Sequence, residues 1–166
     1  MNSKWIKIAV TMLDGTLKLV LWITDNNAGI KREYSEAGVQ ASLDKYACAS
    51  QIASWRVVPE SFHLPDRTFR NAWRDDGKKK AAVDMVHARE IHKDHLRHCR
   101  EPVLTALDVE YQRADEAGDA AAKAAVAQRK QALRDITAHP GITAAKTPDA
   151  LKAIWPEELG SPDQWR

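Results

Sequence analysis

The sequence predicts an α+β protein, with a small N-terminal β-β-α-β module followed by a long C-terminal antiparallel helical hairpin. Two β-rich apolar runs on either side of Asp14-Gly15 predict a β-hairpin. From about Asp84 onward, apolar residues recur at steps of three and four, as in a long amphipathic helix. The predicted parts are the β-β-α-β module (1–58), an Arg/aromatic connector (59–82) and the helical hairpin with a docked C-terminal tail (83–166).

Length and composition exclude several classes of protein. The 166 residues, 44% of them hydrophobic, suit one compact domain or a small domain with an extension. A net charge of +2 is too balanced for a protein that depends on phosphate contacts. We find no apolar run of the roughly 18 residues that a transmembrane helix needs, and no signal-peptide pattern at the N-terminus. With two cysteines, the chain is expected to be a globular protein of a reducing cytoplasm.

The N-terminal hairpin is predicted from its turn. Asp14-Gly15 can supply the positive φ angles of a tight type I′ turn. Lys7 and Lys18 interrupt the apolar alternation and are expected to face solvent. The polar cluster at 25–29 is expected to end the second strand.

A short helix and a third strand complete the predicted module. Ser35 can cap the helix, and Val39 and Leu43 recur at helical spacing. Residues 54–58 are expected to form the third strand, which Pro59 stops. Because a two-stranded hairpin alone is marginal in water, the helix and the third strand are needed to stabilise it.

The connector contains two aromatic residues at helical spacing. Asp66 can cap one or two helical turns in which Phe69 and Trp73, four residues apart, place both rings on one side. We expect these rings to be buried anchors of the connector rather than platforms for nucleic-acid bases.

The positive charge of the connector has two interpretations. Arg67 and Arg70 could bind nucleic acid beside the aromatic rings, or they could pair with acidic residues on adjacent helices while the lysine run at 78–80 stays solvated. Acidic residues within the connector weaken a phosphate-binding field, so we expect nucleic acid not to be the partner.

The long helix is predicted from an apolar stripe made of Ala88, Ile91, His95, Cys99, Val103, Leu107, Tyr111 and Ala114. About thirty residues give a rod of roughly 45 Å, which Pro102 should kink or split. Gly118 is expected to end this helix and Asp119 to cap the next one.

The second helix is too short to cover the first. About twenty residues from Asp119 span only about 30 Å, so part of the stripe needs the sheet, the tail around Trp155 and Trp165, or another chain as its cover. We therefore expect exposed apolar surface near Leu107 and Tyr111, and docking of a partner or a second copy there.

No residue is predicted to be catalytic. His92, His95 and Cys99 share a helical face and could bind zinc with a fourth ligand, but His95 and Cys99 also lie on the packing stripe, so we expect no metal and no cofactor. Cys48 and His63 could be a nucleophile and its base, although a small buried thiol is the simpler explanation for Cys48.

Two pairs of segments resemble known bacteriophage proteins. The segments LPDRTFRNAW (64–73) and VDMVHAREIH (83–92) resemble small proteins encoded in tailed-bacteriophage and prophage structural gene clusters. The segments QRKQALRD (128–135) and TPDALKAIWP (147–156) are similar to the C-terminal end of tail-fibre assembly and tail-associated proteins. The resemblance covers residues 55–156 and carries over no catalytic residue.

This resemblance implies a tail-associated protein that acts by protein–protein interaction in the virion or the host-cell cytoplasm. It would be a virion structural component or a tail-fibre assembly factor, with a tail or tail-fibre protein as its partner. The alternative is a phage-encoded regulator or inhibitor that binds nucleic acid or a host protein complex. The candidate interaction residues are Arg67, Phe69, Arg70, Trp73, Leu107, Tyr111 and Trp155.

Overall fold

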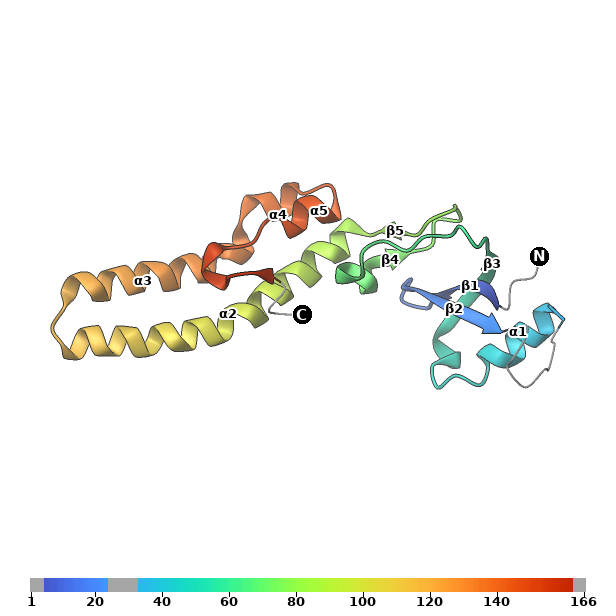
Figure 1. Cartoon of the computed structure of the whole chain (residues 1–166), viewed down its shortest axis with the longest axis horizontal. Helices are drawn as coiled ribbons and strands as arrows, with labels where there is room; N and C mark the ends of the chain where they lie inside the picture. The colour runs from blue at the N-terminus through green and yellow to red at the C-terminus, as the bar shows by residue number, and fades with distance from the viewer. Residues whose placement is uncertain (1–4, 24–32, 163–166) are drawn as a thin grey trace. The chain divides into compact units, whose positions relative to one another are not determined.

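A computed structural model describes residues 5–23 and 33–162 of the chain, in two compact units, Met1–Asp84 and Met85–Arg166 (Figure 1). The first contains a small antiparallel sheet and the second is mostly helical, which confirms the α+β class. Connector residues 59–82 lie within the first unit rather than between the units. The predicted turn at 25–29 and Trp165 lie outside the described residues.

The sheet has three strands in the order β2-β1-β3. β1 (Trp5–Met12) is the central strand and pairs antiparallel with both β2 (Leu17–Ile23) and β3 (Ile52–Val58). The two strands predicted around Asp14-Gly15 are therefore present, and the third strand begins two residues earlier than the sequence indicated.

The β1–β2 turn differs from the predicted type I′ geometry. Gly15 has a φ of +79°, but positive φ among the described residues is confined to glycines, so Asp14 does not share it. The Gly15 N–H donates to the Met12 carbonyl at 2.9 Å, and the Met12 N–H donates to the Thr16 carbonyl at 2.9 Å. This pattern is typical of a three-residue loop that ends in a left-handed glycine. The Asp14 carboxylate accepts the Thr16 N–H at 2.8 Å and holds this longer loop in place.

One face of the sheet is covered by α1 (Glu36–Leu43). Ser35 caps this helix as predicted, because its hydroxyl accepts the Gly38 N–H at 3.1 Å. The core on this side consists of Ile8, Val10, Met12, Trp22, Val39 and Leu43.

The opposite face is covered by the connector. Its core consists of Ala9, Leu17, Val58, Phe62, Trp73 and Ala81. Lys7, predicted to face solvent, instead donates from Nζ to the carbonyls of Glu60 and Phe62 and so ties the connector to β1.

The connector is not a single helical segment. Asp66 caps the 3-10 helix η2 (Arg67–Ala72) as predicted, accepting the Thr68 N–H at 2.8 Å. Phe69 has non-helical backbone angles, and Trp73 begins β4 (Trp73–Arg74), which pairs with β5 (Ala82–Val83). The two rings therefore do not share one helical face, because strand pairing with residues ten positions downstream overrides the local helical spacing.

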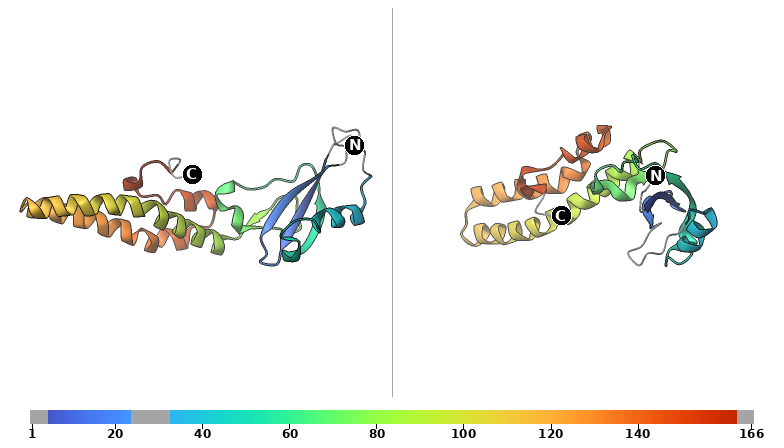
Figure 2. Two further views of the ribbon diagram at one scale, coloured as in Figure 1. Left: turned by 90° about the horizontal axis from the view of Figure 1, so that it is seen from below. Right: turned by 45° about the vertical axis from the view of Figure 1, so that its right-hand side comes forward.

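The second unit is built on two neighbouring helices, α2 (Met85–Glu116) and α3 (Ala120–Asp135) (Figure 2). Pro102 lies inside α2 without dividing it, at an exposed position where water can satisfy the carbonyl that loses its N–H partner. Asp119 caps α3 as predicted, because its carboxylate accepts the Ala122 N–H at 2.9 Å. No helix in the described part of the chain is both long and apolar enough to cross a membrane.

Contacts between α2 and α3 bury the apolar side chains that face each other. Leu107 of α2 is 1% exposed, and Val126 and Leu133 of α3 are also buried. The ion pairs that join the two helices are Lys123–Asp115, Arg129–Glu110 and Lys130–Asp108. The prediction that Leu107 is exposed is therefore wrong.

The N-terminal half of α2 is covered by the chain after α3. This segment includes α4 (Pro140–Ala144) and α5 (Pro148–Lys152), with Ile142, Leu151 and Leu159 buried. Arg89 donates to the Ala145 carbonyl at 2.9 Å, and the Trp155 ring lies 5.4 Å from the His95 ring, centroid to centroid. The chain's own C-terminal segment therefore covers much of the stripe that was expected to need a partner.

We expect Gly15→Val to lower the free energy of unfolding by about 1–3 kcal/mol, the usual cost of a strained backbone position. A Cβ at Gly15 would meet the Arg74 side chain at an ordinary 3.5 Å, so the cost comes from the positive φ rather than from a clash. Urea denaturation measures the change. Gly15→Asn should cost less, because asparagine tolerates this region, and an unchanged midpoint for the valine variant would contradict the turn geometry.

Candidate binding groove around the edge of β2

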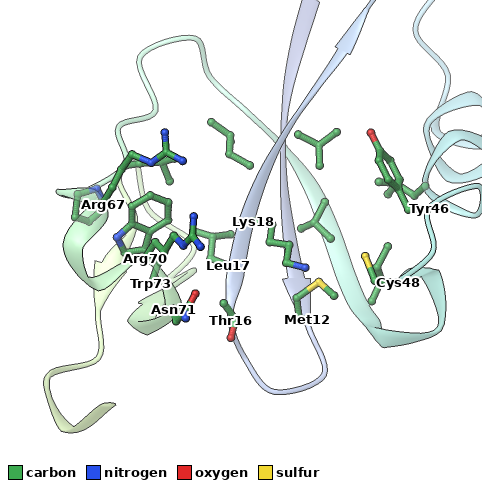
Figure 3. Close-up of a pocket in the computed structure, with 17 residues that line it drawn as sticks. Met12, Thr16, Leu17, Lys18, Tyr46, Cys48, Arg67, Arg70, Asn71 and Trp73 are labelled. Carbon is green, nitrogen blue, oxygen red and sulfur yellow. The ribbon is translucent and has the colours of Figure 1, made fainter. Parts of the chain in front are cut away.

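A groove of about 810 Å³ surrounds β2 in the first unit (Figure 3). It extends over both faces of the strand. We call its two halves the α1-side lobe and the η2-side lobe. The α1-side lobe is lined by Met12, Lys18, Val20, Leu43, Tyr46 and Cys48. The η2-side lobe is lined by Leu17, Leu19, Leu64, Arg67, Arg70 and Trp73.

The alternation of β2 places its side chains in both lobes. Leu17 and Leu19 pack in the core that contains Trp73, whereas Val20 packs against the core under α1. Successive side chains of a strand point to opposite faces of its sheet. The groove therefore passes over the outer edge of β2.

The backbone at this edge directs hydrogen-bonding groups away from the sheet. The Met12 N–H bonds to Thr16 across the β1–β2 turn, whereas the Leu13 N–H donates to the Gln51 carbonyl at 2.7 Å on the β3 side. In antiparallel pairing, successive residues of a strand point their N–H and C=O groups alternately to one side of the strand and to the other. In the β1–β2 pair, the β2 residues at even positions therefore bond to β1, and those at odd positions point away from it. The β2 residues whose N–H and C=O groups point outward are therefore Leu17, Leu19 and Leu21. In the described residues β2 is the end strand of its sheet, with β1 as its paired neighbour.

Three cations lie around the groove without a carboxylate partner. Lys18, Arg67 and Arg70 are exposed and form no ion pair with another described residue. Of the three, Lys18 also contributes to lowering the pKa of Asp14, after the larger effects of the hydrogen bonds with Thr16 and the charge of Arg74. The rim of the groove therefore carries positive charge.

Other cations of the same unit are paired. Arg56 makes two hydrogen bonds of 2.7 Å to the carboxylate of Asp75, and this pairing raises the pKa of Arg56 and lowers that of Asp75. Lys78 pairs with Asp76 at 3.5 Å, and Arg74 pairs with Asp84 at 3.4 Å. The connector's charge is thus divided between paired structural cations and free cations at the groove.

The structure brings three predicted site residues together: Arg67, Arg70 and Trp73 all line the η2-side lobe. Phe69 is 1% exposed and does not line the groove. Trp73 is 7% exposed, and its Nε1–H donates to the Asp66 carbonyl at 3.3 Å. Neither ring has a free face on which a base could stack.

The predicted site residues of the second unit are occupied by contacts within the chain. The ammonium groups of Lys123 and Lys130 lie 5.2 and 5.1 Å from the ring centre of Tyr111. The indole of Trp155 donates to the Gly160 carbonyl at 2.8 Å. Leu107 is buried, so these residues do not form an open docking surface.

The groove residues that sequence reasoning missed are those of the β2 edge and the α1-side lobe, including Lys18 and Tyr46. The alternation of apolar residues identified β2 as a strand. Its place at the end of the sheet depends on the strand order, which no local pattern encodes.

His92 and Cys99 of α2 are packing residues in the structure. His92, rather than His95, is fully buried, and its Nε2–H donates to the Ile154 carbonyl at 3.0 Å. Burial raises the pKa of the Cys99 thiol. Among residues 5–23 and 33–162, no group of three His, Cys, Asp or Glu side chains is placed to hold a metal ion.

Cys48 lines the groove, but the described lining includes neither a histidine nor a carboxylate beside it. His63 instead lies in the connector, bridged to Lys80. The groove therefore offers apolar surface, backbone hydrogen-bonding groups and positive charge, which are features of a binding site.

We expect Trp73→Ala to lower the free energy of unfolding by about 3–5 kcal/mol, as deletion of a buried aromatic side chain does. Trp5→Ala is the matched control, because Trp5 is 46% exposed and its removal should change stability little. Denaturation followed by circular dichroism measures both. A Trp73→Ala protein as stable as the Trp5→Ala protein would contradict the anchoring role.

We expect the second unit to lose stability as pH falls below about 6.5. Burial, and to a smaller degree the neighbouring His95, lowers the pKa of His92 from its ordinary 6.5, while the bond to Ile154 opposes this shift. The unfolded chain therefore binds a proton more readily than the folded one, and the stabilisation present at neutral pH is lost on acidification.

Thermal unfolding at pH 7.5 and 5.0 tests this expectation. His92→Gln, whose amide can still donate to Ile154, should reduce the difference between the two midpoints. His98→Gln, at an exposed position of the same helix, should leave it unchanged. An equal pH dependence in all three proteins would exclude His92 as the source.

No protein-family model matches this chain, and no curated protein or solved structure shows significant similarity to it. The similarity of residues 55–156 to phage tail-cluster proteins therefore stays a prediction from the sequence.

Proposed function

We propose that this chain is a protein-binding component of a bacteriophage tail, either a virion structural protein or a tail-fibre assembly factor. The observation that carries the proposal is the groove around β2, which joins apolar surface to a strand edge that no other described residue pairs with. Through it the chain binds a tail or tail-fibre protein, in the virion or in the host-cell cytoplasm.

The groove has the components of a protein-recognition site. Leu19, Val20 and Tyr46, which are partly or largely exposed, provide apolar area whose burial favours association. The outer edge of β2 provides backbone donors and acceptors, and the free cations provide orientation and selectivity.

The phage setting rests on the resemblance found in the sequence. The segment LPDRTFRNAW (64–73), which carries the more distinctive part of that resemblance, includes Leu64, Arg67, Arg70 and Trp73 of the η2-side lobe. The same residues therefore support both the setting and the binding role.

In this proposal α2 and α3 form an antiparallel helical hairpin that serves as a structural arm. Three ion pairs join residues 108–115, at the C-terminal end of α2, to residues 123–130 of α3. The remaining large apolar side chains exposed on α2 are Val86 and Val109, at 71% and 44%. A contact with a second copy would have to use small apolar patches of this kind, so the groove is the stronger candidate for the partner site.

The alternative, a regulator that binds nucleic acid, receives support only from the free cations at the groove. The aromatic rings of Phe69 and Trp73 are buried, and Arg56, Arg74 and Lys78 are engaged by carboxylates. A protein partner uses the apolar lobes as well as the charge, so it accounts for more of the site.

The test is deletion of the gene from a phage that carries it, with purified particles examined by electron microscopy and mass spectrometry. We expect particles with missing or fibre-less tails, and co-purification of the tagged chain with one tail protein. The wild-type gene and a Lys79→Glu/Lys146→Glu variant, changed at exposed lysines outside the groove, should restore assembly. Intact, infectious particles without the gene would overturn the proposal.

A further inference from the structure

We propose that the groove binds an extended peptide segment of the partner as an additional strand on β2, and that this segment alternates apolar and acidic residues. The inference rests on the proposed protein-binding role and specifies the chemistry of the ligand. Strand addition to a free sheet edge is an established mode of peptide recognition.

The backbone supplies the first part of the argument. The N–H and C=O groups of Leu17, Leu19 and Leu21 point outward along the end strand of the sheet. Such an edge attracts another strand unless it is covered or charged. A chain lying about 4.8 Å away would satisfy these groups over roughly 13 Å, the length of four residue steps.

The two lobes supply the second part. Alternate side chains of an added strand would fall on opposite faces of the sheet. Those on one face meet the accessible apolar surface of Val20, Tyr46 and Cys48, which has the exposed Lys18 beside it. Those on the other face meet the guanidinium groups of Arg67 and Arg70 (Figure 3). Apolar residues suit the α1-side lobe, and carboxylates suit the η2-side lobe.

Charge selects among the possible occupants. Pairing of β2 with β2 of a second copy would bring the cations Lys18, Arg67 and Arg70 of both copies to one interface, where like charges repel. An acidic segment removes that repulsion and pairs the cations. The groove is therefore better suited to an acidic partner peptide than to another copy of this chain.

The experiment titrates the full chain, labelled with ¹⁵N, with a capped synthetic peptide of alternating valine and glutamate. We expect amide shifts at Leu17, Leu19 and Leu21, and hydrogen exchange at these amides slowed by about tenfold or more. The Val20 amide, already bonded to β1 by the alternation of pairing, serves as the internal control. High salt should weaken binding.

Matched variants and peptides show which features of the ligand the groove recognises. Arg67→Glu/Arg70→Glu should bind about tenfold more weakly, because two ion pairs become repulsions. Lys79→Glu/Lys146→Glu makes the same change in net charge outside the groove and should bind normally. A peptide with the same residues in blocks, and one with lysine for glutamate, should bind poorly.

Other results overturn the inference. No shift at the β2 amides, equal binding of the block peptide, or tighter binding of single-stranded oligothymidine would each do so. A tail protein that binds the Arg67→Glu/Arg70→Glu variant normally would retain the proposed function and reject this site. Specific peptide binding in a chain whose deletion leaves tails intact would retain the site and reject the phage setting.

Discussion

The fold of the first unit depends on burial of β1 from both sides. Ile8, Ala9 and Val10 are consecutive and each is at most 2% exposed, so adjacent side chains on opposite faces both need a cover. The single helix α1 can cover one face, and the connector supplies the other with Phe62 and Trp73. Residues that look like a linker in the sequence are therefore part of the core. Because residues of both covers, including Leu43 of α1 and Trp73 of the connector, line the groove, the same covers also form its walls.

The features predicted correctly are those that neighbouring residues determine. The caps Ser35, Asp66 and Asp119 each bond to an N–H two or three residues away, and the freedom of Gly15 is a property of that residue alone. Apart from the type I′ geometry of the β1–β2 turn, the features predicted wrongly depend on distant partners. Trp73 leaves the helical pattern because it pairs with Val83, and the binding edge exists because β3 pairs with β1 instead of β2. Local spacing contains no information about either choice.

In α2 of the second unit, too, the local pattern predicts the helix, whereas contacts with distant residues determine which side chains are buried. Steps of three and four identified α2, yet the histidine that is fully buried is His92 and not His95, which the stripe had included. A buried imidazole needs a hydrogen-bond partner, and the Ile154 carbonyl provides it from the C-terminal segment. Leu107 is likewise buried by α3, although the stripe alone suggested a surface for another chain. The spacing of apolar residues predicts a helix, whereas the segments that pack against the helix determine which of its faces is covered.

Basic and acidic residues are nearly equal in number over the whole chain, but positive charge is concentrated at the groove. A net charge of +2 argues against a protein that depends on phosphate contacts, but it does not exclude an acidic peptide partner. In the first unit Arg56 and Arg74 are held by carboxylates and hold the connector together, whereas Arg67 and Arg70 are left at the groove. Screening limits the effect of such charges to about 10 Å, so their immediate surroundings determine what binds there. Two free guanidinium groups beside an apolar strand edge favour a ligand that carries both carboxylates and apolar side chains.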